Sequence, residues 1–333
     1  MKKIVVFAVY YGNFPTYFPL FLLSCKYNNT IDFVIVTDNK DMNKLYDIPE
    51  NVKIVNITLQ DIKQRLDKVI GFDTKLTTPY KLCDVKVMYG EVFNDYVKDY
   101  DFWGYCDIDL IFGDIRHFLT DKILESAEKC YVLGHFSLYK NTNKINKLFM
   151  YLPECKDDFT IRSGFYNEVL STPITKGFDE TRGIYEICKK KQINLYHSSD
   201  YADLWIKYTR FKLADHKFGY ELRKNYNYQV FYWENGKIKR AYLDNEEMKY
   251  DEFVYIHHLP KKYSKHSIQI SPECTSFWIT NKGFFEKENK EVTIKDIKKY
   301  NPFYGKLFER LNKHYLELKS KLTSSKKRKI ILC

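Results

Sequence analysis

Short apolar runs alternate with amphipathic stretches along the first part of the chain. The runs at residues 4–9, 31–37 and 52–57 are rich in β-branched residues, which is typical of strands buried on both faces of a sheet. One helix is expected to begin near Pro15, and another to follow the third run and continue through Leu66. Strands that alternate with helices predict a parallel α/β sheet, which binds nucleotide-type ligands at the carboxyl ends of its strands.

The later patterns are more mixed. We expect helices over residues 79–96, 114–128 and 180–190, and strands over residues 101–109, 131–133 and 253–256. Two further strands, at 229–234 and 237–242, flank the dipeptide Asn235-Gly236. This dipeptide between strand patterns predicts a β-hairpin with a two-residue turn.

The C-terminal segment has a helical period. Its apolar residues recur at three- and four-residue spacing among lysines and arginines, and they are Phe303, Leu307, Leu311, Tyr315, Leu318 and Leu322. We therefore expect one domain over residues 1–281 and a basic amphipathic helical tail over 282–333.

Charge is distributed unevenly between these parts. The net charge is +11, and most of the basic excess lies in residues 282–333. A nearly neutral body argues against nucleic-acid binding, whereas a basic tail suits an anionic lipid surface. Two interpretations of the tail stay open. It could attach the protein to a membrane that carries a lipid-linked acceptor, or dock its apolar face on the protein's own body.

Cysteine spacing and the N-terminal pattern bear on location. The eight cysteines form no C-x-x-C pair, so zinc-ribbon and thioredoxin-like sites have no support, and scattered cysteines fit a reducing cytoplasm. Residues 4–25 carry no charge, but Pro15, Pro19 and the polar run 10–13 interrupt them. They predict a strand, a loop and a helix rather than a signal peptide or a membrane span.

The strongest chemical signal is a pair of carboxylates at the end of a predicted strand. Asp107 and Asp109 follow an apolar and aromatic run, and residues i and i+2 of a strand project to the same side. Two like charges this close favour a cation between them, and Mg²⁺ or Mn²⁺ prefers oxygen ligands with phosphates completing the shell. Such a metal would neutralise the charge that develops on a nucleoside-diphosphate leaving group. The alternative is a structural turn that the aspartates cap.

A family resemblance rests on these residues. The run 101–116 (DFWGYCDIDLIFGDIR), with residues 79–84 upstream and 134–141 downstream, resembles bacterial surface-polysaccharide glycosyltransferases of the GT-A fold. The resemblance covers residues 1–140 and returns near His257. It implies a Rossmann-type, mostly parallel sheet flanked by helices, with a nucleotide-sugar-binding half over 1–140 and an acceptor half over 141–281.

The resemblance also implies roles for individual residues. Asp109 would be a direct metal ligand, Asp107 would bind ribose or reach the metal through water, and His257 would be a further metal ligand. The nucleotide-binding loop would consist of Tyr10, Tyr11, Gly12 and Asn13. An aromatic ring and a glycine after a parallel strand suit a base and a close backbone approach, although either tyrosine could instead pack over the sheet edge. His257 and His258 could equally be a surface pair.

Further donor contacts are expected from four polar residues, which are Asp38, Lys81, Asp84 and Lys261. Lys81, Asp84 and Lys86 lie on one side of the predicted 79–96 helix, and in the resembling family this helix faces the donor. An ordinary surface salt bridge between Lys81 and Asp84 is the competing interpretation.

Asp179 and Glu180 are the candidates for a catalytic base. A transferase that inverts the anomeric centre needs a carboxylate to take the proton of the acceptor hydroxyl. Acidic residues that precede a helix can instead complement its dipole. A retaining mechanism would need no base in this place, so both stereochemical outcomes stay open.

Together these features predict a metal-dependent hexosyltransferase. It would move a sugar from a nucleoside-diphosphate donor, UDP by analogy, to a glycan or lipid-linked glycan of a surface polysaccharide such as a capsule. A sugar-phosphate nucleotidyltransferase is the second possibility, but it usually carries a basic residue in a glycine-rich loop after the first strand, and residues 10–15 contain neither Lys nor Arg. A carbohydrate- or membrane-binding module with a structural D-x-D motif is the third.

Overall fold

The computed structural model describes most of the chain, namely residues 1–153, 161–204, 210–214, 224–258, 267–269, 274–288, 290–311, 314–315 and 318. The chain forms two compact units. The first unit comprises residues 1–111 and 115–198, and the second comprises 112–114 and 199–333. These boundaries differ from those expected at residues 140 and 281, because residues 141–198 complete the first unit and the segment after 281 contributes a strand to the second unit's sheet.

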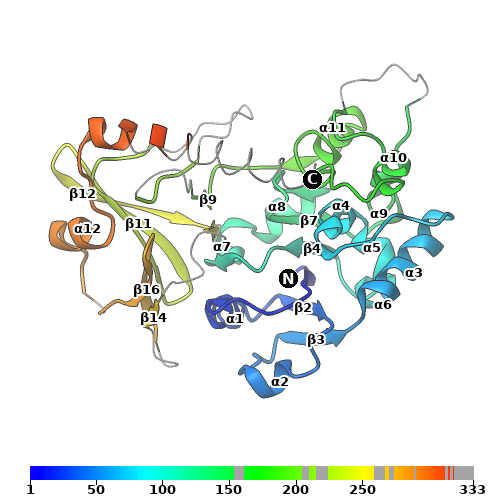
Figure 1. Ribbon diagram of the computed structural model, residues 1–333, viewed down its shortest axis with the longest axis horizontal. Helices are drawn as coiled ribbons and strands as arrows, with labels where there is room; N and C mark the ends of the chain where they lie inside the picture. Colours follow the sequence, from blue (N-terminus) through cyan, green and yellow to red (C-terminus); the bar gives the residue numbers. More distant parts are fainter. Residues whose placement is uncertain are drawn as a thin grey trace, which may run out of the picture. The chain divides into compact units, whose positions relative to one another are not determined.

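A seven-stranded, mostly parallel sheet of order β3-β2-β1-β4-β7-β6-β8 forms the centre of the first unit (Figure 1). The strands are β1 (Ile4–Val9), β2 (Asp32–Thr37), β3 (Val52–Asn56), β4 (Phe102–Cys106), β6 (Lys129–Cys130), β7 (Phe136–Lys140) and β8 (Leu195–Tyr196). Neighbours from β3 to β4 are parallel, and β7 runs antiparallel to both β4 and β6. The predicted α/β class with a mostly parallel sheet is therefore confirmed.

Helices cover both faces of this sheet. On one face, Val5 and Phe7 of β1 share a core with apolar residues of α3 (Leu59–Ile70), α5 (Tyr89–Val92), α9 (Asn143–Asn146) and α11 (Ile184–Lys190). On the other face, α1 (Phe18–Lys26) buries Cys25, where burial and the nearby thiol of Cys106 raise the pKa of the Cys25 thiol. The remaining helices of the unit are α2 (Met42–Leu45), α4 (Leu82–Val85), α6 (Asn94–Val97), α7 (Ile115–Phe118), α8 (Asp121–Ser126) and α10 (Tyr166–Leu170).

Some predicted elements of the first unit are interrupted. The segment predicted as one helix over 79–96 is a series of short α and 3-10 turns from Pro79 to Val97, and the one over 114–128 divides into α7 and α8. The strand predicted at 131–133 is wrong. Tyr131 has a φ of 65°, a left-handed conformation that a regular strand does not adopt, so the chain turns there between β6 and β7.

The second unit is built on a six-stranded sheet of order β12-β11-β10-β15-β16-β14. Its strands are β10 (Gln229–Glu234), β11 (Lys237–Asp244), β12 (Glu247–Phe253), β14 (Ser267–Gln269), β15 (Ser276–Thr280) and β16 (Gly283–Glu286). The predicted hairpin is confirmed, since β10 and β11 pair antiparallel around Asn235 and Gly236. Both turn residues have positive φ, 47° and 80°, as a type I′ turn requires.

A smaller sheet accompanies it. β13 (Tyr255–His257) pairs in parallel with β9 (Ala202–Asp203), so the strand predicted over 253–256 divides between β12 and β13. β5 (Leu110–Phe112) ends in this unit, where the Gly113 N–H donates to the Val254 carbonyl at 2.8 Å.

The C-terminal part of the described chain begins as a packed helix. α12 (Ile294–Tyr300) starts with a capping box between Thr293 and Asp296, and its Tyr300 ring stacks on Trp278 at 4.8 Å. Farther along, Leu307 and Leu311 are 71% and 63% exposed. Much of the helix predicted over 303–322, and all of residues 319–333, lies outside the described residues. None of the helices in the described ranges combines the length and the apolar character needed to cross a membrane.

Candidate functional site

The strand order of the first unit brings two predicted site segments together. From β1 the chain leads through α1 to β2 on one side, whereas β4 lies on the other side of β1. Loops that leave such neighbouring parallel strands diverge, and ligands of parallel α/β sheets bind at this point of the strand order. Residues 10–13 follow β1 and residues 107–109 follow β4.

Asp107 and Asp109 occupy a tight turn between β4 and β5. Both aspartates are half-buried, whereas Ile108 between them is only 7% exposed. The two carboxylates are therefore more accessible than the apolar side chain between them. The Asp107 N–H donates to the His135 carbonyl at 2.9 Å, which fixes the turn against the start of β7. The alternation expected from the sequence is thus retained through the turn.

The loop after β1 lies beside Asp109. Burial, followed by the negative charge of Asp109, raises the pKa of both Tyr10 and Tyr17. The Tyr10 hydroxyl donates to the Asn13 carbonyl at 3.2 Å. Gly12 is exposed and has a φ of 99°, so glycine is required here by backbone conformation. The loop therefore presents exposed backbone near the carboxylate pair.

Tyr11 has a structural role on the other side of this loop. Its hydroxyl donates to the Ile57 carbonyl at 2.8 Å, and its ring packs against the core. Burial and then the negative charge of Asp38 raise its pKa. Asp38 itself is exposed after β2. Tyr11 anchors the loop to the end of β3, which matches the packing alternative for this residue.

Lys86 forms the electrostatic centre of the site. Its ammonium lies 2.6 Å from Asp107 Oδ1 and 3.4 Å from Asp179 Oδ2, and it donates to the Gly134 carbonyl at 3.0 Å. Burial alone would lower its pKa, but the two carboxylates outweigh burial and raise the pKa well above the usual lysine value. Lys86 was predicted to share one helix side with Lys81 and Asp84, but it was not assigned to the site. The available signal was its place in the mostly apolar segment 82–88, because a lysine is buried among apolar residues only when it is paired.

Asp179 and Glu180 reach the same place from a distant part of the chain. A Cβ atom on Gly134 would lie 2.5 Å from Asp179 Oδ2 and 2.8 Å from Glu180 Oε1, so a larger residue there would displace both carboxylates. Burial raises the pKa of Asp179 to about 7, with Lys86 opposing and Glu180 adding to the shift. Since α11 begins only at Ile184, the two acids are outside its first turn, and the helix-dipole alternative has no support.

The expected donor contacts from Lys81 and Asp84 need correction. Both side chains are fully buried and pair with each other at 2.7 Å. Lys81 also donates to the Val169 and Ile174 carbonyls, and Asp84 accepts from the backbone N–H groups of Lys176 and Phe178. The pair is neither a donor contact nor a surface salt bridge, because its polar atoms hold the segment that leads into Asp179.

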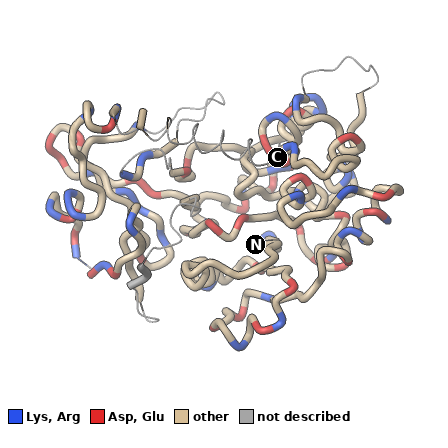
Figure 2. The backbone as a smooth tube through the Cα atoms, in the orientation of Figure 1, with Lys and Arg blue, Asp and Glu red and all other residues tan. Residues whose placement is uncertain are grey.

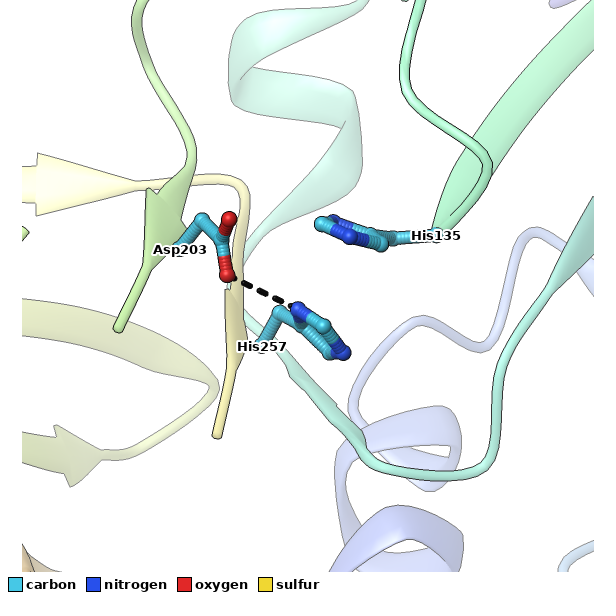
Figure 3. Close-up of side chains that lie close together, drawn as sticks. All are labelled: His135, Asp203 and His257. Carbon is cyan, nitrogen blue, oxygen red and sulfur yellow. Dashed lines mark hydrogen bonds and ion pairs between the residues drawn. The ribbon is translucent and has the colours of Figure 1, made fainter. Parts of the chain in front are cut away.

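The second unit contains a buried carboxylate–histidine pair. His257 Nδ1 lies 2.8 Å from Asp203 Oδ1, and the parallel register of β13 and β9 aligns the two residues (Figure 3). His257 and His258 are 4% and 3% exposed, so the surface-pair alternative is wrong. His135, drawn in the same view, belongs to the first unit. Lys261 lies outside the described residues.

Comparison with known proteins identifies a family without an assigned activity. No curated protein matches the chain. One matching solved structure is an active-site mutant of LgtC, which is 11% identical, with 61% of this chain and 75% of that chain covered at a TM-score of 0.32. This similarity is too low to support a statement on fold or function. A model of a family of unknown function (DUF6625) matches residues 6–288, and the chain therefore belongs to this family.

Proposed function

We propose that this protein is a metal-dependent glycosyltransferase of the GT-A type. It transfers a hexose from a nucleoside-diphosphate sugar, with UDP as the favoured nucleotide, to a glycan or lipid-linked glycan acceptor. The observation that carries the proposal is the grouping of Asp107, Asp109, Lys86 and Asp179 beside the β1 loop, where the strand order reverses. The resemblance carried by residues 101–116 supports the same reaction class.

The residues after β4 fit a divalent metal by the chemistry of their donor atoms. Asp107 and Asp109 offer carboxylate oxygens, which Mg²⁺ and Mn²⁺ prefer. A metal bound there would supply the positive charge that stabilises a leaving diphosphate. His257 remains a predicted further ligand. Within its own unit, His257 Nδ1 is hydrogen-bonded to Asp203 Oδ1. A carboxylate in that position commonly fixes the tautomer of a histidine that ligates a metal through Nε2.

The other residues bind the donor and handle a proton. Lys86 provides a fixed ammonium whose charge complements phosphate oxygens. Tyr10 offers a ring to the base, and Gly12 and Asn13 offer exposed backbone. Asp179, with a pKa of about 7, can accept a proton near neutral pH, which is the requirement for a general base. Glu180 is the second candidate for that role.

A nucleotide-sugar screen tests the proposal. Thermal unfolding is followed with UDP and a panel of nucleotide sugars, each with MnCl₂ or with EDTA, and the products of slow turnover are separated. We expect stabilisation by UDP only with the metal, and release of free UDP. Release of pyrophosphate would identify a nucleotidyltransferase instead. Stabilisation that is absent, or equal with and without metal, would favour a non-catalytic binding module.

A membrane role for the tail is also part of the proposal. Among the described residues the tail exposes Leu307 and Leu311, and the sequence around them is basic. Such a segment can lie in the headgroup region of an anionic membrane, where a lipid-linked acceptor would be presented. A cytoplasmic location accordingly stays a prediction.

A further inference from the structure

Among the described residues, α12 covers only part of one face of the six-stranded sheet of the second unit. Side chains alternate along β10, so Val230, Tyr232 and Glu234 share this face. α12 covers one end, where Val230, Trp278 and Ile297 form an apolar cluster. The end near Glu234 lies beyond this cluster.

An open cavity of about 600 Å³ occupies that uncovered end. Its lining consists of Tyr232, Glu234, Asn235, Lys239, Tyr250, Glu252, Lys287, Lys290, Glu291 and Val292. The antiparallel register sets Tyr232 opposite Lys239, and Lys239 opposite Glu252, so adjacent strands build the floor. The volume falls in the range of about 300–1,000 Å³ that is usual for small-molecule sites.

A network of ion pairs makes this floor rigid. Glu234 accepts from Lys239 and Lys287, each at 2.9 Å. Lys287 is 5% exposed, donates also to the carbonyls of Glu288 and Lys290, and lies over the Tyr232 ring at 5.1 Å. Because Glu234, Lys239 and Lys287 are paired with one another, they hold polar atoms in fixed positions on this floor.

The composition of the lining identifies the class of ligand. Three glutamates and three lysines balance, and acidic and basic residues are mixed along the strands of this unit (Figure 2). Tyr250 is 48% exposed and presents its ring. Burial, followed by the charges of Glu234 and the neighbouring acidic and phenolic groups, raises the pKa of the Tyr232 hydroxyl, which therefore lies among carboxylates. The exposed ring of Tyr250 beside paired donors and acceptors suits a neutral ligand with many hydroxyl groups.

We propose that this cavity binds an uncharged oligosaccharide, with the Tyr250 ring against a sugar face and Glu252 accepting from its hydroxyl groups. All lining residues of the cavity belong to the second unit, whereas the carboxylates of the candidate site belong to the first. The assignment of this oligosaccharide as the acceptor rests on the proposed glycosyltransferase function. Binding itself does not depend on that function.

The test uses the full-length protein without nucleotide or divalent metal. It is applied to an array of defined oligosaccharides, uncharged chains of hexose and N-acetylhexosamine and anionic chains with uronic or sialic acid, and the strongest binder is titrated by calorimetry. We expect binding to uncharged chains, weakened about tenfold in Tyr250→Ala and in Glu252→Gln. The matched control is Tyr304→Ala, which removes another exposed tyrosine of the same unit and should bind as the wild type does.

Three outcomes would overturn the proposal. They are no binding to any uncharged chain, binding confined to anionic chains, or equal affinity in the Tyr250→Ala and wild-type proteins at unchanged melting temperature. The acceptor role has a separate readout, because Tyr250→Ala should then raise the KM for the bound oligosaccharide and leave nucleotide-sugar hydrolysis unchanged. If the wild type binds oligosaccharide but never releases UDP, the glycosyltransferase proposal fails while the cavity assignment stands.

Discussion

At the scale of single residues, one ammonium group serves two carboxylates. Lys86 contacts Asp107 more closely than Asp179, at 2.6 Å against 3.4 Å, and only Asp179 is almost fully buried. The positive charge of Lys86 therefore stabilises the ionised form of Asp107 more than that of Asp179. Asp179 retains the cost of burial, which explains why its pKa lies near 7 although a lysine is its neighbour.

This shift predicts a pH-dependent stability in the metal-free protein. The pKa of Asp179 is raised to about 7 in the folded state, against about 4 in the unfolded state. The stabilisation that Asp179 contributes is therefore fully present below about pH 4 and is lost as the pH rises through about 7. Urea unfolding at several pH values should show this loss in the wild type, worth about 1.4 kcal/mol per unit of pKa difference. In Asp179→Asn the slope over this window should be smaller. Equal slopes in the two proteins would show that Asp179 titrates normally.

Asp109 is the residue whose replacement should separate function from folding. We expect Asp109→Asn to lower turnover by about 100-fold or more. The metal that would neutralise the leaving diphosphate loses a carboxylate ligand in this variant. The variant should also lose metal-linked stabilisation by UDP. Its melting temperature without ligands should match the wild type, since the side chain is half-exposed in a turn.

A matched control accompanies this variant. Asp99→Asn removes an exposed carboxylate shortly before β4 and should retain full turnover. Wild-type turnover in Asp109→Asn would exclude this carboxylate as a metal ligand.

At the scale of elements, a buried ion pair determines how Asp179 is presented. Lys81 and Asp84, on the short turns that follow Pro79, bind backbone groups at positions 169, 174, 176 and 178. Asp84→Ala would leave the Lys81 ammonium buried without its carboxylate, so we expect a loss of about 3–5 kcal/mol in the free energy of unfolding. Chemical denaturation measures this loss.

Activity under stabilising conditions provides a second readout for Asp84→Ala. Turnover should fall because the segment before Asp179 loses its anchor. As a control, Asp73→Ala breaks the pairs that a 68% exposed carboxylate makes with Lys63 and Lys75, and it should change the unfolding midpoint much less. An unfolding midpoint for Asp84→Ala as close to wild type as that of Asp73→Ala would contradict the anchoring role.

Elements specified by local chemistry were predictable from the sequence. The β-branched run at residues 4–9 forms β1 with the expected bounds, and Asn235-Gly236 forms the expected turn. Elements specified by tertiary contacts were not. The positive φ of Tyr131 has no sequence signature in an apolar run, and the helical period near Pro79 did not reveal that its lysines would be buried.

The same division applies to the candidate site. Asp107 and Asp109 follow from strand alternation, and the loop at Tyr10 follows from the position of β1 in a parallel sheet. The approach of Asp179 to Lys86 joins segments far apart in the chain, which no local pattern encodes. The pairing of His257 with Asp203 depends on β9, a strand of two residues that is too short to show a period.

At the scale of the whole molecule, the proposed donor site and the proposed oligosaccharide cavity belong to different units. The first unit holds the carboxylates, Lys86 and the loop after β1, and its parallel sheet has its own apolar core. The second unit has an antiparallel sheet with a separate apolar cluster and a charge-balanced cavity. Each unit therefore has an apolar core of its own that can support its site.

The C-terminal segment yields the prediction that concerns the protein as a whole. Glu309 pairs with the buried Arg210 and with Lys212, so residues up to this point belong to the second unit, and a truncation before Glu309 would damage it. Substitution is the sharper test. The double variant Leu307→Gln and Leu311→Gln should lose sedimentation with vesicles of phosphatidylcholine and phosphatidylglycerol, because both side chains are exposed beside a basic tail.

The control for the double variant is an exposed leucine outside the tail. Leu45 is 61% exposed in the first unit, so Leu45→Gln removes similar apolar area away from the tail and should sediment with vesicles as the wild type does. Nucleotide-sugar hydrolysis should be unchanged in both variants, since neither alters the carboxylate site. If the double variant sedimented like the wild type, the tail would not be the membrane contact. If it lost hydrolysis together with sedimentation, the tail would instead stabilise the folded protein, because a peripheral anchor affects access to a lipid-linked acceptor without affecting donor chemistry.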